Sequence, residues 1–534
     1  MQANSITNWL FGVFSQRGKL VWLLTIGTLA LLDRLFLTVN FHFLLTDDDQ
    51  LIMWHGLEDY AHGVFREPFF YGQDYNLMVE PFLAVPLLWL GIEHWVALPI
   101  VSMMLGLLPF FLIALVFARG QHWLSASLAL GWPMLMPIEY GIISNLPRGH
   151  ITGIALASIS CLSLASPRTT WSAVLFAICL PLGFIACPNS LLLLALLSTY
   201  LLVCNRGKLR FYLIVGLGFF VGSIAFSSMK CFYVLHPEIV THAPWNEYRL
   251  NWIFPAFQEG DVTAMLNNLL PIFANSANFV LPSILVLCLV HWFTDKKMAL
   301  ATFVSICAAI LALGHSRVFD GSSDLFFSFS RHWLGLVVVI CFSLTWALRN
   351  VELRLFLMPL LLLGFLSNVG YKSLQINEIN EKYTSHRTSP VIKVFEVATL
   401  EKECIEIQRV CSKLNVDLVI PFDDVNPKSY PINRGCPLLV DNYPASITGL
   451  NDRLTWKLKE NIQKKFKNVL LYNCRDSLEI PDSINWIRIS TPKNAILIKN
   501  FNKTPLQLLD ILGVPSFENR RSLLLNSMNQ SQLP

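Results

Sequence analysis

Long apolar runs separated by short polar segments fill the first 370 residues of the chain. A helix needs roughly 20 apolar residues to cross the hydrocarbon of a membrane, and many of these runs approach that length. In membrane proteins generally, Lys and Arg are enriched in the loops on the cytoplasmic side. With the basic connections on the cytoplasmic side, the runs alternate consistently and predict about eleven crossings. They lie near 20–44, 95–117, 122–140, 149–166, 171–187, 189–204, 211–229, 277–294, 299–314, 332–348 and 355–370.

An odd number of crossings places the two ends of the chain on opposite sides of the membrane. The basic connections put the N-terminus in the cytoplasm and the segment after residue 370 outside. Residues 45–94 then form the first outer loop. Within it, Pro81–Ile92 is apolar but too short to cross, so we expect a helix at the membrane interface or against the bundle.

The pattern changes after residue 370. Helix-like stretches alternate with short β-rich runs, "VDLVIPF", "NVLLYN" and "NAILIKN". This alternation predicts a small α/β domain at 371–534, which follows a transmembrane domain at 1–370. Four cysteines in this tail could form disulfides if it is exported, but their spacing leaves the pairing open. They are Cys404, Cys411, Cys436 and Cys474.

Composition supports a polytopic α-helical membrane protein. Hydrophobic residues make up 54% of the chain and charged residues 14%, against about 25% charged in soluble domains. The net charge of +4 gives no reason to expect a nucleic-acid partner, and membrane lipids are the expected surroundings. The 12 cysteines form no CxxC pair, and the histidines show no ligand spacing. The sequence therefore predicts no metal site and no other cofactor.

An acidic cluster, Asp47, Asp48 and Asp49, lies where the first apolar run ends. One interpretation is structural, because aspartates favour the start of a helix through capping and the helix dipole. The following segment, "DYAHGVFREPFFYGQDYNLMVEP", points to chemistry instead. It combines aromatic rings with carboxylate, amide and guanidinium groups, a mixture typical of sugar-binding sites.

This loop resembles that of the GT-C membrane glycosyltransferases. The nearest resemblance is to bacterial transferases of the dolichyl-phosphate-mannose-protein mannosyltransferase-like group, in the class that includes the aminoarabinose transferases. A late segment, "SFSRHWLGLVVVICFSL", resembles the Arg-Tyr entry of that group into a span, with His332 in place of the Tyr. The chain has three aspartates where the group often has an acidic pair. The matching loop residues are Tyr71, Gly72, Gln73, Tyr75 and Glu80.

The resemblance implies a GT-C-like fold and an inverting sugar transfer. The donor would be a polyprenyl-phosphate-linked sugar, and the acceptor a lipid, glycan or protein, at the outer face of the bacterial cytoplasmic membrane. In such a reaction a carboxylate takes the acceptor proton, and cations stabilise the leaving phosphate. We rank Asp48 and Asp47 ahead of Asp49 as the base. The expected substrate-binding residues are Tyr71, Gln73, Tyr75, Glu80, Arg148, Arg331 and His332.

Arg331 is the first candidate for the donor phosphate, because guanidinium matches phosphate oxygens, and Arg148 is the second. A contact between Arg331 and lipid headgroups is the alternative. Asp33 and Arg34 fall inside the first span, where we expect them to pair with each other or with a neighbouring helix.

Two rival functions are a polysaccharide polymerase or ligase and a lipid or solute transporter. A polymerase or ligase is expected to have Arg-rich outer loops and no sizeable soluble tail. A transporter is expected to have matching halves with interrupted helices, and the sequence shows no such repeat. Release of sugar from a polyprenyl-phosphate-linked donor would distinguish the three functions.

Overall fold

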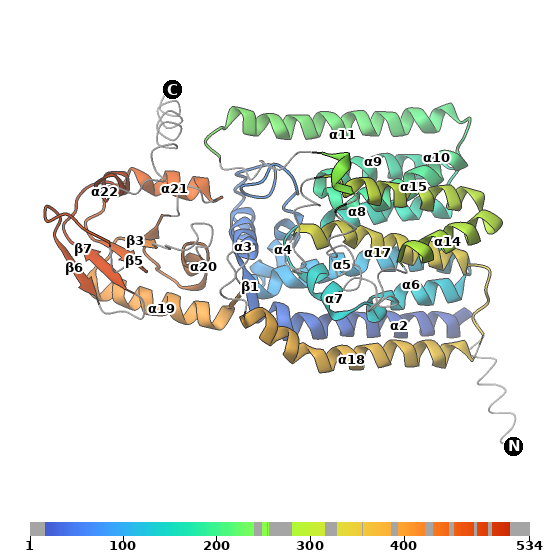
Figure 1. The fold of residues 1–534 in the computed structure, drawn as a ribbon, viewed down its shortest axis with the longest axis horizontal. Helices are drawn as coiled ribbons and strands as arrows, with labels where there is room; N and C mark the ends of the chain where they lie inside the picture. The colour runs from blue at the N-terminus through green and yellow to red at the C-terminus, as the bar shows by residue number, and fades with distance from the viewer. Residues whose placement is uncertain are drawn as a thin grey trace, which may run out of the picture.

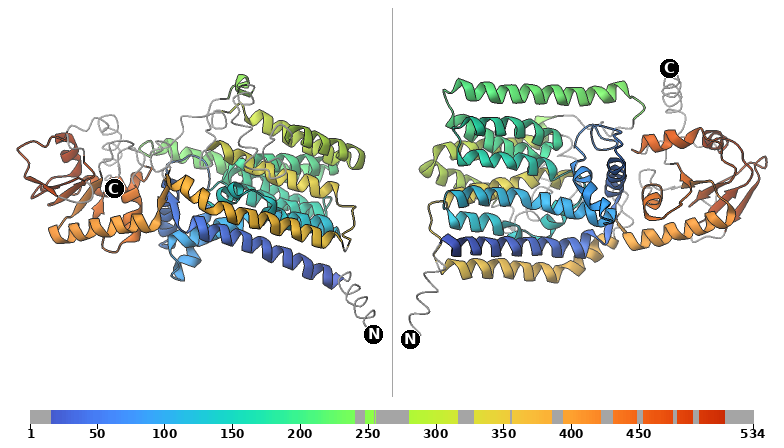
Figure 2. Two further views of the ribbon diagram at one scale, coloured as in Figure 1. Left: turned by 60° about the horizontal axis from the view of Figure 1, so that its bottom comes forward. Right: turned by 180° about the vertical axis from the view of Figure 1, so that it is seen from behind.

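The structure is a computed structural model, in which a long helical bundle adjoins a smaller α/β unit (Figure 1). Two further views show the same division, with the α/β unit beyond one end of the bundle (Figure 2). The described residues are 16–239, 248–253, 255, 280–315, 328–354, 356–385, 394–421, 431–447, 453–474, 478–489 and 494–512.

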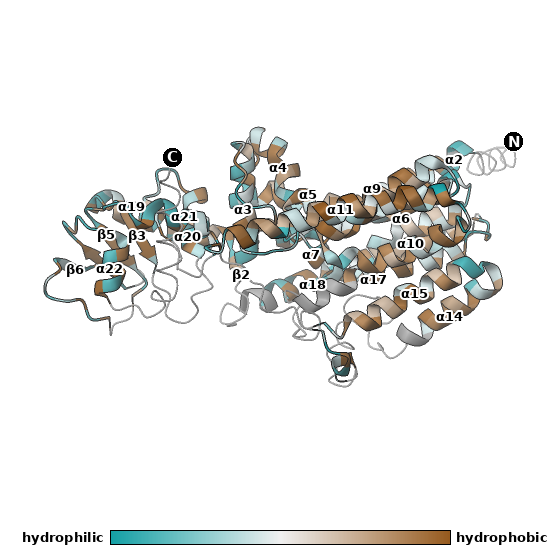
Figure 3. Ribbon diagram, turned by 90° about the horizontal axis from the view of Figure 1, so that it is seen from above, coloured by the Kyte–Doolittle hydropathy of each residue, from teal (hydrophilic) through white to brown (hydrophobic). Residues whose placement is uncertain are grey.

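The bundle consists of apolar helices, most of which run along a common direction (Figures 1 and 3). Their apolar surface is expected, since lipid surrounds the outer helices of a membrane bundle. They are α2 (Gln16–Leu37), α5 (His94–Arg119), α6 (Trp123–Leu135), α7 (Ile138–Asn145), α8 (Thr152–Ile159), α9 (Thr170–Ala186), α10 (Leu191–Cys204), α11 (Leu209–Leu235), α14 (Val280–Thr294), α15 (Lys296–Ala312), α17 (Ser328–Ala347) and α18 (Leu357–Ser385).

Four of the described helices are long and apolar enough to cross a membrane, and the bent pair α6–α7 gives a fifth candidate. Several others are apolar but shorter, so the count of eleven crossings stays a prediction. Helix α2 continues as η1 (Thr38–His42) and α8 as η2 (Ser160–Ala165), while η3 (Pro188–Ser190) precedes α10. A further short helix, η4 (Leu250–Trp252), lies between α11 and α14 in the sequence.

The predicted pairing of Asp33 and Arg34 inside the bundle is confirmed. Arg34 lies 3.8 Å from Asp33, and Lys372 of α18 lies 2.5 Å from the same carboxylate, with all three side chains no more than 3% exposed. Arg34 also donates to the carbonyl of Pro133 at 2.8 Å. Asn368 donates to the carbonyl of Met134 at 2.7 Å. These contacts satisfy carbonyls at the break between α6 and α7, where the chain bends by 90°.

At the end of the bundle nearest the α/β unit lie β1 (Leu45–Asp47), α3 (Asp48–Ala61) and α4 (Val79–Trp89) (Figure 1). Helix α4 overlaps the predicted short apolar helix at Pro81–Ile92. It buries Ala84 and Val85 but leaves Phe82 66% and Trp89 71% exposed. Helix α4 contacts α3 and α5, as expected for a helix against the bundle, and its position at the membrane interface stays a prediction.

The α/β unit contains a five-stranded sheet in the order β4-β3-β5-β7-β6. The three predicted β-rich runs form β3 (Leu418–Pro421), β5 (Val469–Tyr472) and β7 (Ala495–Ile498). Strand β3 is parallel to β4 (Ala445–Ser446) and β5, whereas β7 is antiparallel to β5 and β6 (Trp486–Ile489). The accompanying helices are α19 (Val397–Leu414), α20 (Pro431–Leu439), α21 (Thr455–Ile462) and α22 (Pro505–Ile511).

One strand pair joins this tail to the first outer loop, and one disulfide lies within the tail. Strand β2 (Val394–Glu396) lies near the start of the stretch 389–415, whose pattern predicts a helix, and pairs antiparallel with β1, so Val394 lies opposite Asp47. A disulfide between Cys404 and Cys436 joins α19 to α20. The proposed domain boundary at residue 370 falls inside α18, and the division into 1–370 and 371–534 stays a prediction.

Candidate active site

The three aspartates lie at the start of α3, and Asp47 caps this helix. The backbone N–H of Gln50 donates to Asp47 Oδ1 at 2.9 Å, and the backbone N–H of Asp47 donates to Gln50 Oε1 at 2.8 Å. This reciprocal pair is a capping box. The structural interpretation of the acidic cluster is therefore correct for Asp47. It leaves open the roles of Asp48 and Asp49, which occupy the first helical turn.

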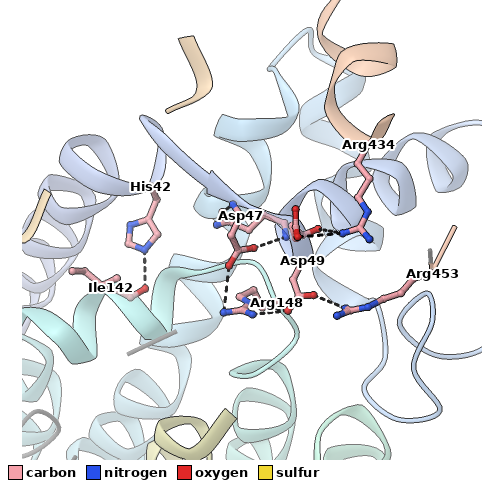
Figure 4. Close-up of polar contacts among 9 residues, drawn as sticks. His42, Asp47, Asp49, Ile142, Arg148, Arg434 and Arg453 are labelled. Carbon is pink, nitrogen blue, oxygen red and sulfur yellow. Dashed lines mark hydrogen bonds and ion pairs between the residues drawn. The ribbon is translucent and has the colours of Figure 1, made fainter. Parts of the chain in front are cut away.

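Arg148 holds two of the aspartates together (Figure 4). It lies 3.3 Å from Asp47 Oδ2 and 2.5 Å from Asp49 Oδ2, and its side chain is 5% exposed. Arg148 comes from the turn between α7 and α8. Helix α7 is fixed to the first span by a 2.7 Å hydrogen bond between His42 Nε2 and the carbonyl of Ile142. The arginine is thus a buried bridge whose position depends on the bent pair of helices.

Two arginines of the tail also reach this cluster (Figure 4). Arg453 lies 2.5 Å from Asp49 Oδ1. Arg434, on α20, lies 3.9 Å from Asp48 Oδ2 and donates to the Asp48 carbonyl at 3.4 Å. The site therefore combines three carboxylates and three guanidinium groups, from the first loop, the α7–α8 turn and the tail.

Asp48 is chemically distinct from its two neighbours. Its side chain is 23% exposed, against 2% for Asp47 and 11% for Asp49. Its Oδ1 atom has no hydrogen-bond partner among the described residues. Burial raises the pKa of Asp48 to about 7, the Arg434 charge opposes this rise, and the neighbouring aspartates add to it. Among the three aspartates, Asp48 is therefore the one best suited to take up a proton near neutral pH.

Glycine 72 allows the loop to approach the tail. Gly72 has a φ of +72°, and a Cβ built there would lie 2.3 Å from the Cβ of Arg453. A larger residue would combine an unfavourable backbone conformation with a direct clash. The glycine of the "YGQ" segment thus leaves room for Arg453, which contacts Asp49. Local sequence cannot reveal this contact.

The sequence also indicated Tyr71, Gln73 and Tyr75 in this loop, and their surroundings differ from one another. Tyr71 is fully buried, and its hydroxyl donates to Asp59 Oδ2 at 2.9 Å. Gln73 is buried, with an Oε1 atom that lacks a hydrogen-bond partner in the described part of the chain. Tyr75 is half-buried. Tyr71 thus shapes the loop through Asp59, and the binding roles of Gln73 and Tyr75 stay predictions.

Glu80 is fully buried and accepts the backbone N–H of Gly149 at 2.9 Å. Burial raises the pKa of Glu80 to about 7. Because Gly149 directly follows Arg148, this bond helps to hold the turn that carries the bridging arginine. Glu80 is thus a positioning residue for the cluster in this geometry.

Arg331 and His332 lie in the first turns of α17, but their side chains fall outside the described part of the structure. Their proposed roles stay predictions. Within the described residues, no group of three or more His, Cys, Asp and Glu side chains is arranged to hold a metal ion.

Comparison with solved structures finds the crystal structure of ArnT from Cupriavidus metallidurans bound to undecaprenyl phosphate. The identity is 12% and the TM-score 0.54, with 89% of this chain and 97% of the ArnT chain covered. The apo state of the same protein gives a TM-score of 0.51 at the same identity and coverage. The chain has an ArnT-like fold.

ArnT is an aminoarabinose transferase of the GT-C fold, so the predicted GT-C-like architecture is confirmed. At 12% identity, the likeness concerns the fold and not the reaction. No protein-family model matches the chain, and no curated protein sequence matches it significantly.

Proposed function

We propose that this chain is an inverting glycosyltransferase that moves a sugar from a polyprenyl-phosphate carrier to an acceptor hydroxyl. The ArnT-like fold supports the class, and the undecaprenyl phosphate bound to ArnT supports the kind of donor. The observation that carries the proposal is Asp48. This carboxylate has a pKa raised to about 7 and lies among three arginines at the end of the membrane bundle.

In the proposed reaction, Asp48 takes the proton of the acceptor hydroxyl as the hydroxyl oxygen attacks the anomeric carbon of the sugar. The bond between that carbon and the phosphate oxygen breaks, and polyprenyl phosphate leaves with the electron pair. A single displacement of this kind inverts the anomeric carbon. A base with a pKa near the working pH is both available in its ionised form and sufficiently basic.

The arginines have different proposed roles. Arg148 contacts Asp47 and Asp49 at the same time, so its main role is to position these carboxylates. Arg453 approaches from the tail and provides N–H donors for the phosphate of the donor, whose charge needs cationic stabilisation. Arg434 lies 3.9 Å from Asp48 and tunes the pKa of this carboxyl. Arg331 remains a candidate for the same phosphate.

The proposed location is the outer face of the bacterial cytoplasmic membrane. The alternation of basic connections supports it. The disulfide between Cys404 and Cys436 supports it further, because such bonds persist in oxidising compartments. Labelling with a membrane-impermeant thiol reagent tests this topology. In a Cys231→Ser background, a cysteine introduced at the exposed Asp482 should react in intact cells, and one introduced at Lys208 should not. The reverse pattern would overturn the topology.

Turnover by the purified protein in liposomes tests the function. The assay follows release of undecaprenyl phosphate from a pool of polyprenyl-phosphate-linked sugars, with an envelope extract as acceptor. Asp48→Asn should lower the rate about 10²–10⁴-fold, the usual effect of losing a general base. Asp482→Asn, at an exposed aspartate of the tail, is the matched control and should leave the rate unchanged. If Asp48→Asn keeps a near-normal rate, Asp48 is not the base, and another carboxylate of the first outer loop, Glu80 or Asp74, becomes the next candidate.

A further inference from the structure

A cavity of about 360 Å³ opens between the bundle and the tail, separate from the aspartate cluster. Its walls come from residues 64–67 of the first loop, residues 232–239 at the end of α11, and residues 455–459 of α21. Its volume lies at the lower end of the range of roughly 300–1,000 Å³ for small-molecule sites. The cavity is therefore matched to a compact ligand rather than to a long lipid chain.

The cations in its walls already have carboxylate partners. Arg66 lies 2.9 Å from Asp59, and Lys459 lies 2.8 Å from Glu238. An anionic ligand would have to compete with these carboxylates. A neutral ligand with many hydroxyl groups can accept from the cations and donate to the carboxylates without breaking either pair. The paired charges thus favour a neutral polyol over a phosphate or a sugar acid.

Aromatic rings provide the remaining contacts. Phe65 is 69% exposed at the rim, and Phe232 and Trp456 are half-buried in the walls. The Arg66 guanidinium lies 3.6 Å from the centre of the Trp456 ring and fixes its position. Aromatic faces combined with a few fixed polar groups are the usual lining of a small-molecule site, and they suit the C–H face of a sugar ring.

Glu67 adds a buried carboxyl to this lining. It is 2% exposed, and its Oε2 accepts the Gly72 N–H at 3.2 Å and the Tyr233 hydroxyl at 3.4 Å. Burial raises the pKa of Glu67 to about 8. At neutral pH this carboxyl is mostly protonated, so it presents an O–H donor as well as an acceptor, again without adding net charge.

The cavity is connected to the aspartate cluster through two elements. Trp456 packs against His55 of α3, with ring centres 5.9 Å apart. Arg453, three residues before Trp456, contacts Asp49. A ligand in the cavity therefore lies beside the elements that form the proposed active site.

We propose that this cavity binds a neutral saccharide portion of the acceptor. The acceptor is thereby a glycan or a glycan-bearing molecule, and this assignment rests on the proposed transferase function. The walls come from both the first loop and the tail, so the site requires the tail to be docked on the bundle.

Saccharide binding is measured without any turnover, on the full-length Asp48→Asn variant in nanodiscs by saturation-transfer NMR. The probes are the neutral disaccharides maltose, lactose and cellobiose, the anionic glucuronic acid, and the lipid-like octanol. At least one neutral disaccharide should bind at millimolar concentration. Phe65→Ala, at an exposed position with little risk to folding, should weaken this binding by up to tenfold. Phe82→Ala, at a similarly exposed ring on α4, is the matched control and should leave binding unchanged.

Binding of glucuronic acid or octanol in preference to all three disaccharides would overturn the proposal, and so would no binding of any disaccharide. Equal effects of Phe65→Ala and Phe82→Ala would overturn it as well. In the otherwise wild-type enzyme, Phe65→Ala should raise the acceptor KM and leave the maximal rate within twofold. Failure of the transferase function would appear separately, as no release of undecaprenyl phosphate by the wild-type protein.

Discussion

The pH dependence of turnover gives the most direct test of Asp48 as the base. The reaction needs this carboxylate in its ionised form, so activity is present above its pKa and is lost as the pH falls through that value. With a pKa of about 7, roughly three-quarters of the Asp48 carboxylates are ionised at pH 7.5, and only about one-tenth at pH 6. The maximal rate should therefore fall about eightfold between these two pH values.

Arg434 provides the perturbation that makes this test specific. Its guanidinium lies 3.9 Å from Asp48 and lowers the pKa of the carboxyl. A cation at this distance typically lowers a carboxyl pKa by about 1–3 units, and the partial exposure of Asp48 favours the low end. Arg434→Gln should therefore raise the Asp48 pKa to about 8. The acidic limb of the pH profile, where the rate falls as the carboxylate becomes protonated, should move to the same pH. At pH 7.5 the rate should fall about threefold, and above pH 9 it should approach the wild-type rate.

The assay is the maximal rate of undecaprenyl phosphate release at saturating donor, measured from pH 5.5 to 9.5. Asp49→Asn removes a neighbouring negative charge that raises the Asp48 pKa, so its acidic limb should move in the opposite direction, to lower pH. Arg488→Gln, on the exposed face of β6, should leave the limb in place. A wild-type rate that is constant between pH 6 and 8, or an Arg434→Gln rate that stays low at every pH, would refute the reasoning.

Three further perturbations test the structure around the site. Arg148→Gln leaves two buried carboxylates without their shared cation and should destabilise the bundle by about 3–5 kcal/mol; an unchanged thermal midpoint in detergent would contradict the buried bridge. The Cys404–Cys436 disulfide joins residues 32 positions apart in the sequence. Its loss should destabilise the tail by about 4 kcal/mol, which limited proteolysis with and without reductant would measure. Gly72→Ala should cost about 1–2 kcal/mol in backbone strain and displace Arg453; if turnover and donor affinity are unchanged, the close approach is not needed.

The parts of the site that are close in sequence could be predicted. The end of an apolar run located the aspartates, and the sequence also marked Arg148, in a turn expected on the same side of the membrane. Both predictions depend on the direction in which a helix crosses the membrane, which the distribution of Lys and Arg among the connections indicates. The β-rich runs predicted β3, β5 and β7 for a similar reason, because buried strands have an apolar pattern of their own.

The cations from the tail could not be predicted. Arg434 and Arg453 lie 386 and 404 residues from the aspartates that they contact. A single arginine in a polar segment has no periodicity that distinguishes it from a solvated residue. The same applies to Lys372, whose partner Asp33 is on the first span. In each case the packing of helices and strands determines which carboxylate the cation meets. The cation can be recognised as part of a buried ion pair only when its burial is known.

Strand pairing explains why the tail reaches the cluster in a fixed position. Asp47 is the last residue of β1, caps α3 and forms an ion pair with Arg148. Because Asp47 lies opposite Val394 in the β1–β2 pair, the strand that leads into α19 is hydrogen-bonded to the segment that carries the three aspartates. A one-residue slip in this pair would turn side chains to the opposite face of the ladder. The register of β1 with β2 thus couples the position of the tail, and with it Arg434, to the geometry of the carboxylates.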